Sequence, residues 1–158
     1  MIRAATPADV PVILELIHAL AVYEKLESDA VAKPDDLATH LFGARPYAEC
    51  LLADEAGIVV GFALFFHNYS TFRGQPGIYL EDLFVKLEYR GHGYGKALFV
   101  ELAKLAVDRK CVRLEWAVLD WNAPSIAFYE RLGAIPLNEW TTYRLTGDAM
   151  RTLAQAKK

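Results

Sequence analysis

The first forty residues carry two helical patterns of apolar positions. Apolar side chains recur at helical spacing over Val10–Leu20. The preceding Thr6–Asp9 segment has a capping residue and a proline, which is typical of a helix start. A second short helix is predicted from about Pro34 to Phe42, with Gly43 favouring its end. Residues Ile2–Ala5 are predicted to form a short strand before the first helix.

The middle of the chain changes to the patterns of β-strands. Apolar runs predict strands over Tyr47–Ala53, Ile58–Phe66 and Ile78–Val85. The turn-forming segment Asp54–Gly57 predicts a hairpin between the first two. His67–Gly77 contains glycine and proline and is predicted to be a loop.

The last third alternates helix and strand signals again. A glycine-rich turn at Gly91–Gly95 precedes a helix that is predicted to run to about Arg109. A strand over Val112–Leu119 and a helix over Ala123–Leu132 follow. Ala134–Thr146 is predicted to contain one or two more strands. This order predicts an α/β (α+β) fold with a mixed central sheet flanked by helices.

Length and composition agree with one globular domain. The chain has 158 residues, of which 54% are hydrophobic and 23% charged. We expect a single domain over residues 1–153 and a polar C-terminal tail over 154–158. No stretch is long and apolar enough to predict a membrane span.

Charge and cysteine usage exclude several classes of function. The net charge of −3 argues against a nucleic-acid binder that acts through a basic surface. Neither Cys50 nor Cys111 has a spacing typical of a disulfide framework or a zinc site, and the four histidines share no ligand spacing. We therefore expect no metal, no membrane partner and a cytoplasmic location.

The segment Arg90–Lys96, with the sequence RGHGYGK, is the strongest local motif. Glycines at a helix start let backbone amides converge on an anion such as a pyrophosphate. The segment is not a Walker A loop, because three residues separate Gly91 from Gly95 and Ala97 stands where Ser or Thr is needed. A plain strand-to-helix turn is the alternative.

Two adjacent carboxylates interrupt the apolar strand at Glu81 and Asp82. Neighbouring side chains of a regular strand point to opposite faces. Both carboxylates can line one pocket only where a bulge or a strong twist intervenes. A buried carboxylate also needs a partner, which favours a functional role for at least one of them.

Together, these segments resemble the GNAT acetyltransferases. The cofactor loop motif appears as Arg90-x-x-Gly93-x-Gly95. The segments Tyr79–Val85 and Leu119–Ser125 resemble the subfamily of spermidine/spermine (diamine) and thialysine N-acetyltransferases. The resemblance implies the acyl-CoA N-acyltransferase fold. It also implies direct transfer of an acetyl group from acetyl-CoA to a primary amine of a diamine, polyamine or lysine analogue.

Two alternative functions stay open at this stage. One is acetylation of a protein lysine or N-terminal amine, which would need an open peptide groove. The other is a non-catalytic acyl-CoA-binding sensor, which could have lost the catalytic residues. The relatives that the chain resembles are homodimers, so the resemblance also implies a homodimer.

The resemblance assigns two catalytic residues. Tyr129 matches the general acid, and a phenol with a pKa of ~10 can protonate the departing thiolate. Glu81 matches the residue that deprotonates the amine. From the residues alone, Tyr129 is equally compatible with a packed helix tyrosine whose hydroxyl reaches the surface.

An acidic and aromatic set is implied at the amine end. The residues that match substrate contacts are Tyr23, Glu24, Glu81, Asp82 and Trp140. Aromatic faces and carboxylates both attract ammonium groups. For Glu24, a solvated charge at a helix end is the alternative.

The implied cofactor contacts lie in three segments. The residues that match cofactor contacts are Leu83, Phe84, Val85, Arg90, Gly91, His92, Gly93, Tyr94, Gly95, Lys96, Asn122, Pro124, Ser125 and Tyr129. Backbone groups at the strand end would polarise the acetyl carbonyl and pair with the pantetheine arm. Asn122 is also a favourable helix N-cap, and both roles can hold together.

Overall fold

The computed structural model describes residues 1–156. The chain divides into two compact units, Met1–Ala117 and the segment from Val118 onward. Each unit is described in its own frame. Within the described residues, no helix is long and apolar enough to cross a membrane.

The first unit contains the whole sheet. Its strands are β1 (Ile2–Ala4), β2 (Glu49–Glu55), β3 (Ile58–Ser70), β4 (Gln75–Val85) and β5 (Leu114–Trp116). Its α-helices are α1 (Val10–Glu24), α2 (Pro34–Phe42) and α3 (Tyr94–Asp108). Three single 3₁₀ turns complete it: η1 (Pro7–Asp9), η2 (Glu27–Asp29) and η3 (Leu87–Tyr89).

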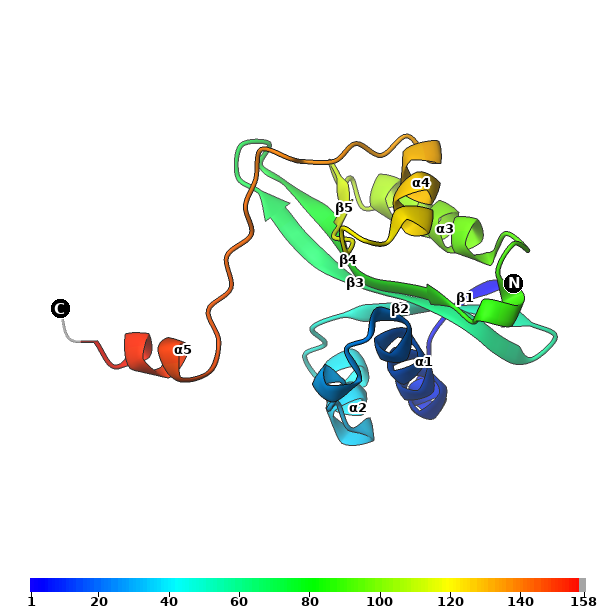
Figure 1. The fold of residues 1–158 in the computed structure, drawn as a ribbon, viewed down its shortest axis with the longest axis horizontal. Coiled ribbons are helices and arrows are strands. Elements are labelled where there is room, and N and C mark those ends of the chain that lie inside the picture. The colour runs from blue at the N-terminus through cyan, green and yellow to red at the C-terminus, as the bar shows by residue number, and fades with distance from the viewer. Residues whose placement is uncertain (157–158) are drawn as a thin grey trace. The chain divides into compact units, whose positions relative to one another are not determined.

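The sheet is mixed, which confirms the expected fold class. Its five strands lie in the order β1-β2-β3-β4-β5. The first four pair antiparallel, whereas β5 pairs parallel to β4. Figure 1 shows α1 and α2 on one face of the sheet and α3 on the opposite face.

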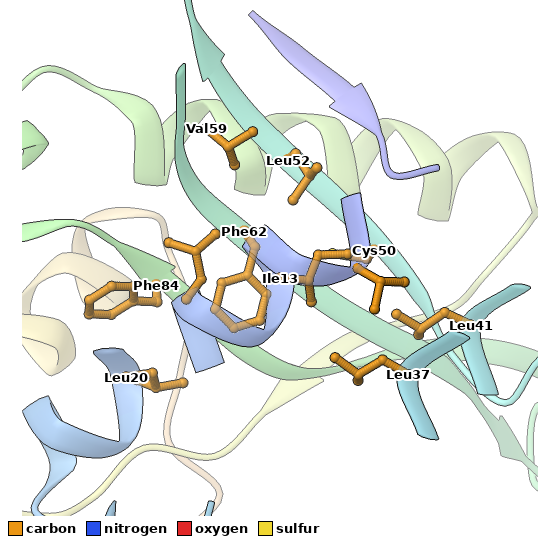
Figure 2. Close-up of a cluster of buried hydrophobic side chains, with 11 residues drawn as sticks. Ile13, Leu20, Leu37, Leu41, Cys50, Leu52, Val59, Phe62 and Phe84 are labelled. Atoms are coloured by element: carbon orange, nitrogen blue, oxygen red, sulfur yellow. The ribbon is translucent and has the colours of Figure 1, made fainter. Parts of the chain in front are cut away.

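One hydrophobic core lies between the sheet and the α1–α2 pair. Ile13 and Leu16 of α1 are fully buried, as is Phe62 of β3. Helix α2 adds Leu37 and Leu41 to the same cluster. Figure 2 shows these side chains converging with residues of β2 and β4. The helical spacing seen in the sequence therefore marks the faces that the helices bury.

The opposite face of the sheet is covered by α3. Its inward residues Leu98 and Leu102 have no exposed surface, and Phe99 is also buried. The Phe99 ring meets the Trp116 ring of β5 edge to face at 4.9 Å between centroids. This ring contact joins α3 to β5.

A charged network fixes the start of the chain. Asp9 is buried and accepts two hydrogen bonds from the Arg3 guanidinium, at 2.8 and 2.9 Å. The Thr6 amide and hydroxyl also donate to Asp9, each at 2.8 Å. These donors hold the pKa of the Asp9 carboxyl well below its ordinary value, the hydrogen bonds from Arg3 contributing most. The network therefore ties β1 to the beginning of α1.

Replacing Asp9 with alanine should lower the free energy of unfolding by about 2–3 kcal/mol at pH 7, because Arg3 and the Thr6 groups lose their acceptor. Since folding lowers the pKa of Asp9, the wild-type protein should lose this contribution as the pH falls below about 4. Urea denaturation at pH 7 and pH 3 tests this. Asp35→Ala, at an exposed position of α2, is the control and should change stability by less than about 0.5 kcal/mol. An equal loss in both variants would contradict the assignment.

Several strand boundaries differ from the sequence predictions. β3 extends to Ser70 and β4 begins at Gln75, so the predicted His67–Gly77 loop is mostly strand. The two strands pair from Gly61 opposite Val85 to Ser70 opposite Gln75. Long-range backbone pairing therefore overrides the local turn signals. β5 is much shorter than predicted, because its pairing with β4 covers only three residues.

The second unit contains two helices, α4 (Ala123–Arg131) and α5 (Gly147–Ala154). The prediction of strands over Ala134–Thr146 was wrong, because this stretch has no strand pairing in the described residues. Helix α5 was not predicted. The tail predicted from residue 154 begins at the end of α5, and residues 157 and 158 of it lie outside the described part.

Candidate functional site

A β-bulge in β4 lies at the pair of carboxylates. Leu64 of β3 is opposite Asp82, and the next residue, Phe65, is opposite Leu80. The register therefore skips Glu81 and shifts by one residue. The bulge that the two carboxylates would need in order to share a pocket is present.

The bulge reverses the faces of β4 on its two sides. Phe84 is opposite Phe62, and both belong to the core beneath α1. Asp82, two residues before Phe84, points to the same face. Leu80 is opposite Phe65, whose ring lies under the guanidinium of Arg109 at the end of α3. Leu80 therefore packs on the α3 side, and Asp82 turns toward α1.

Asp82 and Glu24 lie close together on the α1 side, and Glu81 is near enough to act on Asp82. Burial raises the pKa of Asp82 to about 6, and the nearby charges of Glu81 and Glu24 add to this shift. Burial also raises the pKa of Glu24. Within the described residues, no group of acidic, histidine or cysteine side chains could hold a metal ion. The negative charges of these carboxylates attract a cationic group.

The last turn of α1 supplies Tyr23 and Glu24. The helix ends at Lys25, which adopts a left-handed conformation with φ of 62°. The Leu26 amide closes the turn by donating to the Ala21 carbonyl at 2.9 Å. Tyr23 and Glu24 are both half-buried. This termination fixes their position beside the bulged part of β4.

The edge of β4 opens at the same place. Pairing with β5 runs from Ile78 opposite Leu114 to Leu80 opposite Trp116 and then stops. The backbone from Glu81 onward has no β5 partner in the described pairing. An extended chain can add to such an edge through backbone hydrogen bonds. The carboxylates and the open edge therefore begin at the same residue.

The glycine-rich segment follows η3 and starts α3. Gly91 and Gly93 have φ values of 83° and 87°, which favour glycine strongly. Gly93 precedes the helix, and Tyr94 is its first residue. Among the described residues, the N-cap position of α3 supplies no side chain that accepts a hydrogen bond from the first amides of the helix. The turn thus exposes helix N-terminal amides, as anion binding requires.

The Arg90 side chain lies away from the amides of that turn. Its Nε donates to the Val85 carbonyl at 3.0 Å. Its guanidinium carbon lies 4.3 Å from the centre of the Tyr23 ring and 5.5 Å from that of Phe84. The Nδ1 atom of His92 lies 3.1 Å from the Arg90 carbonyl oxygen. The sequence motif identified Arg90 but gave no sign of this contact with α1.

The second unit brings four predicted residues together on α4. Asn122 precedes the helix, and its Oδ1 accepts from the Ser125 amide at 3.4 Å, so the capping interpretation is confirmed. Pro124 lies in the first turn. Tyr129 follows one turn after Ser125, and its ring lies 5.5 Å from that of Phe128. Within this unit, Trp140 lies on the irregular segment after α4 and is 78% exposed.

Sequence reasoning left open whether a bulge lies at Glu81, and it missed the contact between Arg90 and Tyr23. The first had a signal in the sequence. Leu80, Asp82 and Phe84 alternate along the strand, so a regular strand would place a carboxylate between two core side chains. The second had no sequence signal, because Arg90 and Tyr23 are far apart in the chain.

Comparison with known proteins identifies one family and several relatives. Residues 16–134 match the acetyltransferase (GNAT) family. The chain is 41% identical to the thialysine N-epsilon-acetyltransferase of Bos taurus, over 98% of this chain and 96% of the bovine protein. It is 36% identical to the L-ornithine N5-acetyltransferase of Arabidopsis thaliana, over 96% of this chain and 86% of the plant protein.

A solved structure also matches along the whole chain. It is an integron cassette protein of V. cholerae, with a TM-score of 0.83 and 28% sequence identity. The match covers 99% of this chain and 98% of that protein. The expected fold is therefore confirmed.

Proposed function

Because the chain belongs to the acetyltransferase (GNAT) family, we propose that it is an N-acetyltransferase that uses acetyl-CoA and acetylates a primary amine of a small cationic molecule. The relatives named for thialysine and L-ornithine acetylation support this acceptor class. Diamines, polyamines and lysine analogues belong to it.

The β4 bulge is the observation that carries the proposal. An acceptor of this class has one amine that reacts and a second ammonium that stays charged. Asp82 and Glu24 offer carboxylates to the charged end, and Tyr23 offers the part of its ring that the Arg90 guanidinium leaves uncovered. Glu81, which is exposed, serves as the base that removes a proton from the reacting amine, directly or through water. Trp140 is the further proposed contact to the acceptor.

The acetyl-CoA side begins at the open edge of β4. The backbone of Leu83, Phe84 and Val85 binds the pantetheine arm and polarises the acetyl carbonyl as negative charge develops on it. The backbone of Arg90–Lys96 holds the pyrophosphate at the start of α3. Asn122, just before α4, and Pro124 and Ser125 of α4 supply further contacts.

Transfer then proceeds directly from thioester to amine. The neutral amine attacks the acetyl carbon, the carbon–sulfur bond breaks, and the Tyr129 hydroxyl protonates the departing thiolate. The amine loses its proton toward Glu81. Neither cysteine is proposed as a nucleophile, because burial raises the pKa of the Cys50 thiol to about 12 and Cys111 lies outside the proposed site.

We also propose that the two units form one domain over residues 1–153, that the protein is a homodimer and that it is cytoplasmic. The family match runs from residue 16 to residue 134 without interruption and so crosses the boundary between the units. The two cysteines are free thiols, which suits a reducing compartment.

An acceptor screen tests the activity. Thiol release from acetyl-CoA should rise at least about tenfold over background hydrolysis with one or more of thialysine, ornithine, putrescine, spermidine and spermine. Their fully N-acetylated forms are the matched controls and should give background release only. A lysine-containing peptide is tested as an alternative acceptor. Calorimetry measures the binding of acetyl-CoA.

Three results would contradict the proposal. Release with the peptide alone would identify a protein acetyltransferase. Acetyl-CoA binding without release over the whole panel would favour a sensor. A lack of acetyl-CoA binding would remove the cofactor assignment.

A further inference from the structure

The Arg90 guanidinium connects two parts of the proposed site that are distant in sequence. One part is the last turn of α1, which carries Tyr23 and Glu24. The other is the end of β4, whose Val85 carbonyl accepts a hydrogen bond from Arg90 at 3.0 Å. Arg90 itself begins the segment that precedes α3. A single side chain thus contacts the acceptor side and the acetyl side of the site.

The contacts of Arg90 are directional. The Nε atom has only one hydrogen, so the bond to Val85 fixes the orientation of the guanidinium plane. The cation then lies 4.3 Å from the Tyr23 ring centre, well within the range of an attractive cation–π contact. The same guanidinium carbon lies 5.5 Å from the Phe84 ring centre, and the Tyr23 and Phe84 rings are themselves 6.5 Å apart and tilted by 54°. The guanidinium therefore contacts both aromatic rings where the end of α1 meets β4.

This arrangement differs from that expected for a side chain that binds pyrophosphate. The motif alone assigns Arg90 to the anionic cofactor, and its backbone remains in that segment. Its Nε donates to Val85 and its guanidinium lies over Tyr23, so the side chain is directed toward α1. The amides of Gly91–Lys96 and the start of α3 remain available for the anion.

We propose that Arg90 is a positioning residue for the acceptor amine, a role that rests on the proposed function. It holds Tyr23, and with it the turn that carries Glu24, at a fixed place beside the end of β4. Its loss frees the end of α1 to move relative to the acetyl-binding backbone. The acceptor should then bind less well while the cofactor binds as before.

The primary test is Arg90→Met, which keeps an unbranched chain but removes the charge and the Nε donor. We expect KM for the acceptor found in the screen to rise about 3- to 10-fold. The Kd of acetyl-CoA, measured by calorimetry without acceptor, should stay within about twofold. Arg90→Lys should recover part of the acceptor KM, because an ammonium can still lie over the Tyr23 ring.

A double-mutant cycle with Tyr23→Leu tests whether Arg90 acts through Tyr23. The two effects on acceptor KM should be clearly less than additive, because either substitution removes the same contact. Tyr23→Phe, which keeps the ring face, should preserve the effect of Arg90→Met. Arg45→Met, at an exposed position, is the matched control and should leave both constants unchanged. Thermal denaturation confirms that each variant is folded.

Two results would overturn the inference. An increase of tenfold or more in the Kd of acetyl-CoA with an unchanged acceptor KM would make Arg90 a cofactor ligand. Additive effects of Arg90→Met and Tyr23→Leu would show that Arg90 does not act through Tyr23. Either result leaves the acetyltransferase activity of the wild-type protein intact, so it is distinguishable from failure of the proposed function.

Discussion

Replacing Tyr129 with phenylalanine should lower the turnover number by about 100- to 1,000-fold. The substitution removes only the hydroxyl that we propose as the proton donor, and general acid catalysis typically contributes a factor of this size. The ring stays, so its packing beside Phe128, at 5.5 Å between centroids, should be kept. The Kd of acetyl-CoA should change by less than about threefold. Steady-state kinetics and calorimetry give the two numbers.

Tyr143→Phe is the matched control for Tyr129. Tyr143 belongs to the same unit and is 92% exposed, so the same chemical change should leave turnover at the wild-type value. Undiminished turnover in Tyr129→Phe would remove this residue from the acid role.

Replacing Asp82 with asparagine should lower kcat/KM for the acceptor by about 10- to 100-fold at pH 7.5. The amide keeps the shape of the side chain but cannot attract an ammonium, and a charged hydrogen bond has about this worth. The loss should appear mainly in KM if Asp82 binds the charged end of the acceptor. Asp108→Asn, at an exposed position of α3, should leave the kinetics unchanged.

The acid side of the pH profile should identify Asp82 directly. Its pKa of about 6 predicts that wild-type kcat/KM falls as the pH drops below 6, because protonation removes the charge. The Asp82→Asn profile should be flatter there. Deprotonation of the acceptor shapes the basic side of both profiles equally. An acid limb that persists unchanged in the variant would assign the titration to another group.

The same substitution should stabilise the protein without acceptor. Folding raises the pKa of Asp82 from an ordinary 3.8 to about 6. The folded state therefore loses stability as the pH rises from about 4 to about 6, and the loss persists above 6. Asp82→Asn should raise the free energy of unfolding by about 1–2 kcal/mol at pH 8 and by little at pH 4. Denaturant unfolding at the two pH values measures this, and equal effects at both would exclude a charge-based cost.

The simultaneous loss of activity and gain of stability would identify a residue kept for binding. Burying Asp82 near Glu81 and Glu24 is unfavourable in the free protein. A cationic acceptor supplies the missing countercharge. A substitution that removed a purely structural carboxylate would be expected to reduce stability at neutral pH, as we expect for Asp9.

The elements with strong local signals could be predicted from the sequence by itself. The apolar spacing of α1 and the glycine stop of α2 depend on residues within a few positions of each other. The glycine-rich turn was predictable for the same reason, because Gly91 and Gly93 adopt conformations that other residues avoid. The carboxylate pair also stood out, as polar residues within an apolar strand. The family resemblance followed from these same segments.

The tertiary structure decided what these residues face. The period of two indicates that Asp82 does not fit a regular strand, but it cannot locate the residue at which the register shifts, so the shift at Glu81 required β3 to supply the register. The extension of β3 to Ser70 and the three-residue length of β5 likewise depend on pairing with β4. Arg90 lies on Tyr23 because the end of β4 brings it to the last turn of α1. Local sequence determines how a segment folds, whereas face, register and side-chain partners arise from contacts between distant segments.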